Sequence, residues 1–223
     1  GSEMCIRDSS TTDEIISDVN DPLVFENISF GSGSGTSTWT ISKNLDLGGD
    51  LSIVNGTFAK STYEITLEGN LSITDGGIWS GEGTTTFDGS GSVTWSDANA
   101  STSVQNVGNV IIDGVSKVVT LTNNVGSYDL TIGSNDTLSS GSHTIYVAGD
   151  WTNLGAFLAG NGNVEFVPDD RSYPPIVPGS QDWYSDENFS DRIPVVVDDT
   201  EVGNDLFDFP IYVDLSTLGS DFW

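Results

Sequence analysis

Positive charge and sulfur are nearly missing from this chain of 223 residues. It has 6 Lys and Arg side chains against 33 Asp and Glu, one Cys, one Met and one His, and its formal charge is −27. Charge-driven binding to nucleic acid or to an anionic membrane surface is excluded, because both depend on Lys and Arg. A single Cys allows neither an internal disulfide nor a site of several thiolates. No apolar run reaches the roughly 18 residues that a membrane-spanning helix needs.

The only Met and the only Cys, Met4 and Cys5, both lie in the first nine residues. Residues 1–9, GSEMCIRDS, resemble a translated sequencing adapter, and a genuine short leader is the alternative. Such a segment is excluded from the fold prediction. The chain ends on Phe222 and Trp223 without a closing turn, so we expect an internal piece of a longer protein. A missing signal peptide then says nothing about secretion.

Short alternating apolar stretches predict β-strands, and they are separated by segments rich in Gly, Ser, Thr and Asn. Gly-Asp-Leu-Ser-Ile at 49–53 recurs as Gly-Asn-Leu-Ser-Ile at 69–73, and related segments follow. Their apolar residues predict one interior column of Leu51, Leu71, Val93, Val110, Leu130 and Trp151. A step of about 20 residues is typical of a parallel β-solenoid, in which stacking of coils creates the core.

The predicted fold class is therefore all-β: a parallel β-helix (solenoid), followed by the incomplete start of a second β domain. An antiparallel β-sandwich is the alternative, since it also spaces its strands regularly. The repeats keep residue identity as well as turn spacing, and this favours the solenoid. The predicted organisation is an adapter-like segment, a leading segment, solenoid repeats, a Pro-rich linker and a truncated second domain, at residues 1–9, 10–37, 38–167, 168–185 and 186–223.

Residues 186–223 carry an Asp-Arg-Ile-Pro segment at 191–194 and an Asp-Phe-Pro-Ile-Tyr-Val-Asp-Leu run at 208–215. This region resembles the opening of the domain of unknown function family 2341, found in large secreted and surface proteins of bacteria and archaea. Phe189 fills the place of the aromatic residue that is usual before the Arg. The family has no established catalytic residues, so the resemblance implies none here. The upstream repeats are similar to those of large bacterial surface adhesins, which implies an extracellular or cell-surface location.

Catalytic chemistry finds little support in the sequence. The only His, His143, lies at a predicted turn-to-strand position, and a nucleophilic triad needs a His beside a Ser or Cys. No carboxylate pair stands out at a strand end for glycoside hydrolysis, and an acidic rod would repel a polyuronate. We therefore predict no catalytic residues and a structural stalk or adhesive spacer of a large secreted or surface protein. The alternative is a carbohydrate-binding or carbohydrate-active β-helix, with an extracellular polysaccharide or another cell surface as its partner.

Carbohydrate contacts are sought among aromatic side chains, because exposed rings offer an apolar platform with a polar handle. Strand alternation places Trp39, Trp95 and Trp151 inward and Trp79 outward. The candidate carbohydrate contacts are therefore Trp79 and, in the linker region, Trp183 and Tyr184.

A polar residue precedes each apolar residue of the predicted column: Asp50, Asn70, Ser92, Asn109, Asp129 and Asp150. In a solenoid these residues would stack at an outer corner, where Asn side chains can form a hydrogen-bonded ladder. Asp129 and Asp150 would then be like charges in neighbouring coils. A calcium ion bridging them would relieve this repulsion, since it prefers oxygen ligands. The alternative is that both carboxylates point apart into solvent.

Overall fold

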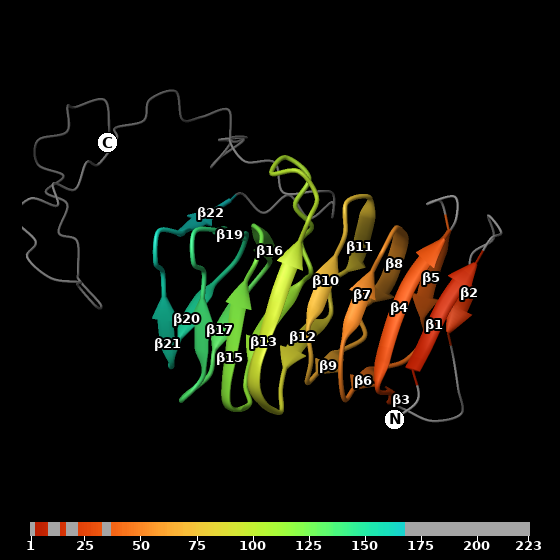
Figure 1. The fold of residues 1–223 in the computed structure, drawn as a ribbon, viewed down its shortest axis with the longest axis horizontal. Coiled ribbons are helices and arrows are strands. Elements are labelled where there is room, and N and C mark those ends of the chain that lie inside the picture. Colours follow the sequence, from red (N-terminus) through yellow and green to blue (C-terminus); the bar gives the residue numbers. More distant parts are fainter. Residues whose placement is uncertain (1–2, 9–13, 17–21, 33–36, 168–223) are drawn as a thin grey trace, which may run out of the picture. The chain divides into compact units, whose positions relative to one another are not determined.

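The computed structural model describes residues 3–8, 14–16, 22–32 and 37–167, and within them it contains β-strands and no helix. All of these residues belong to the first of two units, Gly1–Trp183 and Tyr184–Trp223. The paired strands are parallel, and each strand pairs with strands of the neighbouring coils (Figure 1). The chain is therefore a parallel β-solenoid, as the repeats predict. The alternative of an antiparallel sandwich is wrong, because the paired strands are parallel.

The chain winds through three faces in turn, and the coils stack in sequence order (Figure 1). The first face is an eight-stranded sheet of β1 (Glu3–Asp8), β4 (Asn27–Ser32), β7 (Leu51–Ile53), β10 (Leu71–Ile73), β13 (Ser90–Asp97), β15 (Val115–Leu121), β18 (Thr137–Ser139) and β21 (Ala156–Leu158). The second is a seven-stranded sheet of β3 (Leu23–Phe25), β6 (Leu45–Leu47), β9 (Ile65–Leu67), β12 (Thr84–Phe87), β14 (Asn109–Ile112), β17 (Leu130–Ile132) and β20 (Trp151–Asn153).

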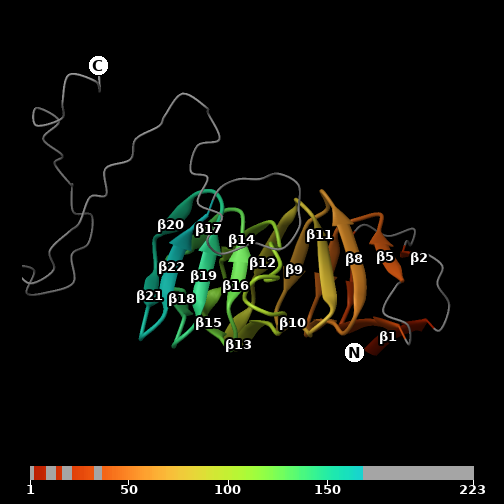
Figure 2. The ribbon, with the colours of Figure 1, turned by 90° about the horizontal axis from the view of Figure 1, so that it is seen from above.

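The third face is divided into two sheets along the stack (Figure 2). One contains β2 (Glu14–Ile16), β5 (Thr38–Ile41), β8 (Gly56–Ser61) and β11 (Gly77–Gly81), and the other contains β16 (Val125–Ser127), β19 (Thr144–Val147) and β22 (Asn163–Phe166). Residues 98–107 lie between them in sequence and form no strand, although Asn106 forms an isolated parallel bridge to Gly126.

Side-chain hydrogen bonds replace the missing ladder at this break. The buried carboxylate of Asp97 accepts the N–H of Gln105 at 2.5 Å and the N–H of Asn99 at 3.0 Å. The side-chain oxygen of Gln105 in turn accepts the N–H of Trp79 on β11 at 3.0 Å. Burial raises the pKa of Asp97, while the bonds from Gln105 and Asn99 act in the opposite direction. The segment is thus tied to both neighbouring coils without a strand of its own.

Regular coils differ by 20 residues, as Leu45 pairs with Ile65 and Ile65 with Thr85 on the second face. Longer coils occur as well, since Leu71 pairs with Trp95 on the first face. Backbone pairing in register places equivalent side chains above one another, with alternate residues facing the interior.

The single interior column predicted from the sequence is wrong in its path, although its members face inward. Leu51 and Leu71 belong to the first face and continue into Trp95, whereas Val110 and Leu130 belong to the second face. The remaining members, Val93 and Trp151, pair with Val119 on the first face and Leu130 on the second. The error arises because similar polar–apolar segments occur on two faces. The longer coils also change the number of residues between equivalent segments, so a step of about 20 residues leads from one face to the other.

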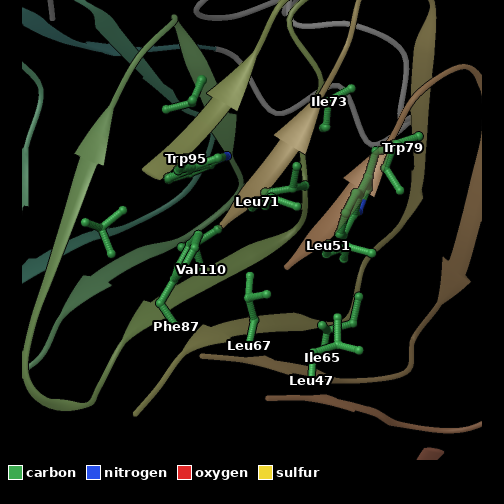
Figure 3. Packing of buried hydrophobic residues seen from close by; sticks show 14 of the residues in the cluster. Leu47, Leu51, Ile65, Leu67, Leu71, Ile73, Trp79, Phe87, Trp95 and Val110 are labelled. Carbon is green, nitrogen blue, oxygen red and sulfur yellow. The ribbon is translucent and has the colours of Figure 1, made fainter. Parts of the chain in front are cut away.

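The interior is a continuous apolar core, with side chains from facing strands pointing toward one another (Figure 3). Aromatic rings form a row in its first half: Phe30 stacks on Phe58 with centroids 4.8 Å apart, and Phe58 meets the edge of Trp79 at 5.0 Å. Trp39 lies 5.8 Å from Phe30, and Trp95 is fully buried further along. Such close packing makes each coil depend on its neighbours.

The stack starts earlier than residue 38, the boundary that the sequence analysis gives. β4 pairs in register with β7, and its residues Ile28 and Phe30 are buried in the core. Glu3–Asp8, within the adapter-like segment, pairs with β4 as β1. The linker and second domain predicted after residue 167 lie outside the described residues.

Candidate functional site

The predicted row of Asp and Asn residues is two rows, one beside each of two faces. Asp50 and Asn70 precede β7 and β10 of the first face, while Asp129 and Asp150 precede β17 and β20 of the second. Ser92 belongs to neither row, since it lies inside β13 opposite Val118. The rows are therefore separate structures, and their chemistry is considered separately.

The row beside the first face is a hydrogen-bonded ladder. The side-chain oxygen of Asn27 accepts the N–H of Asp50 at 2.7 Å, and the carboxylate of Asp50 accepts the N–H of Asn70 at 2.7 Å. The side-chain oxygen of Asn70 accepts the N–H and hydroxyl of Thr94 at 2.8 and 3.0 Å. Each side chain thus satisfies a backbone donor of the next coil, a local bonding habit of Asn and Asp.

Asp129 and Asp150 form a similar contact beside the second face. The Asp129 carboxylate accepts the N–H of Asp150 at 2.8 Å, whereas the side chain of Asp150 is exposed. Across the described ranges, no group of three or more His, Cys, Asp or Glu side chains is arranged to hold a metal ion. The calcium site remains a prediction, and the bond between these residues supplies another partner for the Asp129 carboxylate.

Trp79 is not the exposed aromatic that strand alternation predicted. Only 2% of its surface is exposed, and its ring packs against Phe58, while the neighbouring Ile78 is 46% exposed. Alternation holds across the turn before β11, since Ile73 and Trp79 are six residues apart and both buried, and the prediction is wrong because it took the apolar Ile78 as the inward residue. Trp79 is therefore a core residue and is corrected as a candidate carbohydrate contact. Trp183 and Tyr184 lie outside the described residues.

Two lysines inside the stack were missed by the sequence analysis. Lys60 and Lys117 are both fully buried. The signal for Lys60 is present in the sequence, because it lies two residues after Phe58 on the same strand. Alternation therefore points both side chains to the interior.

Lys60 is enclosed by uncharged groups. Its Nζ donates to the hydroxyl of buried Thr85 at 2.9 Å and lies 5.3 Å from the ring centroid of Trp79. Burial lowers the pKa of Lys60 from 10.5 to about 7, and the charge of exposed Glu64 acts in the opposite direction. The amine is therefore easier to deprotonate than an exposed lysine, and it is held inside the stack by Thr85 and Trp79.

Lys117 lies in a bulge of β15, where Ser90 and Ser92 of β13 pair with Val115 and Val118. Its Nζ donates to the carbonyl oxygen of Glu68 at 2.5 Å, two coils away. Burial lowers the pKa of Lys117, although nearby carboxylates, chiefly Asp88, act to raise it.

Carboxylates around Lys117 lie at the corner between the second and first faces. Asp136 accepts the backbone N–H of Lys117 at 2.7 Å and that of Gly114 at 3.0 Å. Burial raises the pKa of Asp88, and the charges of Glu68 and Asp46 add to this effect. This arrangement joins coils through the buried amine of Lys117.

Comparison with known proteins gives no match to a family model, to a curated protein or to a solved structure. The resemblance of residues 186–223 to the domain of unknown function family therefore stays a prediction. In the part of the chain that the structure describes, no helix is long and apolar enough to cross a membrane.

Proposed function

We propose that this chain is a non-enzymatic segment of a large secreted or cell-surface protein, in which the solenoid acts as a stalk or adhesive spacer. The observation that carries this proposal is the continuous parallel pairing along the stack, eight strands on one face and seven on another. Neighbouring coils are about 4.8 Å apart, so the number of repeats sets the length of such a spacer.

Rigidity is what distinguishes a spacer from a linker. Here each coil is joined to the next by backbone ladders, by the packed core and by side-chain bonds such as that from Asn70 to Asp50 at 2.9 Å. The excess of acidic side chains supports the proposal as well, since charge on exposed β-structure opposes association with other chains.

Pulsed electron paramagnetic resonance tests the rigidity. Spin labels are placed at Ser29→Cys or Ser52→Cys, each combined with Ser139→Cys, in the Cys5→Ser chain. These positions are five and four coil steps apart on the first face, which predicts backbone separations of about 24 and 19 Å. Narrow distributions that differ by one step support the spacer, and broad overlapping distributions contradict it.

A glycan array tests the alternative of carbohydrate binding, with an extracellular polysaccharide as partner. We expect no specific, saturable signal from the full chain. A signal lost in Trp183→Ala or Tyr184→Ala would replace the spacer proposal with a binding function. A signal peptide, more repeats and a surface anchor in the full-length reading frame would support the proposed location.

A further inference from the structure

The last coil of the described stack leaves its inward side chains partly uncovered. Its three strands pair in register with the strands of the coil before it, whose inward residues Leu130, Leu138 and Ile145 are 0% exposed. The corresponding residues of the last coil are only partly buried: Trp151, Phe157 and Val164. The core therefore continues to this end face without a layer of described residues over it.

Two further observations make the end face apolar. Phe166 is 46% exposed, although its partner in register, Val147, is fully buried. Trp151 and Phe157 lie edge to face with centroids 5.0 Å apart, so two of the three faces contribute a ring. An apolar end with rings of this size needs a cover in a soluble stack.

The backbone of the last coil needs a cover as well. β20, β21 and β22 are the end strands of their sheets. Among the described residues they have partners on one side only, and an unpaired strand edge is a template for association with other chains.

We propose that residues 168–183, which continue directly from β22, fold back over this end face as a cap. Sixteen residues can span up to about 50 Å when extended, whereas a strand of four residues is about 13 Å long. The segment is therefore long enough to cross the end of a coil. Because it is tethered there, its effective concentration is in the millimolar range, which favours it over a second copy of the chain.

The composition of this segment suits a cap better than another coil. Twenty residues after Trp151 the chain has Arg171, whose charge does not suit an inward position. Four prolines, at 168, 174, 175 and 178, lack the N–H that a ladder strand donates. Tyr173, Ile176 and Val177 supply apolar surface. Such a segment covers the core and does not offer a new edge on which the stack could continue.

Hydrogen exchange measured by mass spectrometry on the full chain tests the cap. In Ile176→Asp we expect the amides of residues 151–166 to exchange at least tenfold faster than in the unmodified chain. Val115→Asp is the matched control, because it places the same charge on a side chain that is 76% exposed on an earlier coil, and it should leave these amides unchanged. Equal exchange in Ile176→Asp and the unmodified chain would overturn the proposal.

A second measurement distinguishes a cap formed by residues 168–183 from a second copy of the chain bound at the same end face. In the Cys5→Ser chain, Phe166→Cys and Ile176→Cys should form a disulfide within one molecule, whereas Ser52→Cys and Ile176→Cys should not. Crosslinking that is only intermolecular, or protection of residues 151–166 that increases with protein concentration, would assign the end face to a second copy and overturn the cap.

Discussion

The buried amine of Lys60 predicts that the stability of the stack depends on pH. Lys60→Met removes the amine and keeps an unbranched side chain of similar length. Because burial lowers the pKa from 10.5 to about 7, the folded chain binds fewer protons than the unfolded chain between these values. The free energy of unfolding therefore rises with pH in this window, and the cost of the buried amine is complete below about pH 7.

The size of the effect follows from the difference between the two pKa values. A separation of about 3.5 corresponds to about 5 kcal/mol over the whole window. Between pH 7.5 and 9.5 the unmodified chain should gain about 2 to 3 kcal/mol relative to Lys60→Met. Urea unfolding of both chains at several pH values measures this difference. A difference that stays constant within about 0.5 kcal/mol would refute the lowered pKa of the buried Lys60 amine.

Thr85→Val serves as the control for this experiment. It removes the hydroxyl that contacts the amine and keeps Lys60, so it should lower stability by about 1 to 3 kcal/mol at every pH. The increase between pH 7.5 and 9.5 should remain in this variant. If Thr85→Val also lost the increase in stability between pH 7.5 and 9.5, the increase would be due to the hydrogen bond rather than to burial of the amine.

Three further results are expected. Trp79→Ala should lower the free energy of unfolding in urea by about 3 to 5 kcal/mol, whereas Ile78→Ala, on the exposed side of the same strand, should change it by less than about 1 kcal/mol; equal effects would contradict the assigned sides. Asp97→Ala should cost about 2 to 4 kcal/mol and increase hydrogen exchange in residues 98–107, because it leaves buried N–H groups without an acceptor. The melting midpoint should be the same in calcium and in EDTA; a rise in calcium that Asp150→Asn abolishes would instead support a metal at Asp129.

The fold class could be predicted because a solenoid repeats residue types as well as spacing. The face to which each repeat segment belongs could not be predicted, since similar polar–apolar segments occur on two faces. The segments at Leu51 and Val110 look alike in sequence but belong to different sheets. The longer coil containing Asp97 changes the offset between them. Only the pairing register, which the sequence does not contain, assigns each segment to its face.

Alternation within a strand is informative where its phase is taken from a residue that is in fact buried. It identifies Lys60 as an inward residue from Phe58, within a single strand. It fails for Trp79, because the phase was taken from the neighbouring apolar residue Ile78, which is 46% exposed. Counting from buried Ile73 of β10 across the turn gives the inward position of Trp79 that the structure shows, so an apolar residue type alone does not set the phase.

The acidic composition acquires a structural role at the corners of the coils. Asp50, Asp129 and Asp136 each accept a backbone N–H from a different segment of the chain. A carboxylate makes a stronger acceptor there than a neutral amide, and this gain opposes the repulsion between like charges in adjacent coils. The row can be stabilised by a metal ion or by backbone N–H donors. At Asp129 the N–H of Asp150 already provides such a donor. The charge that excludes anionic partners therefore also contributes to joining the coils, which connects the unusual composition directly to the proposed spacer.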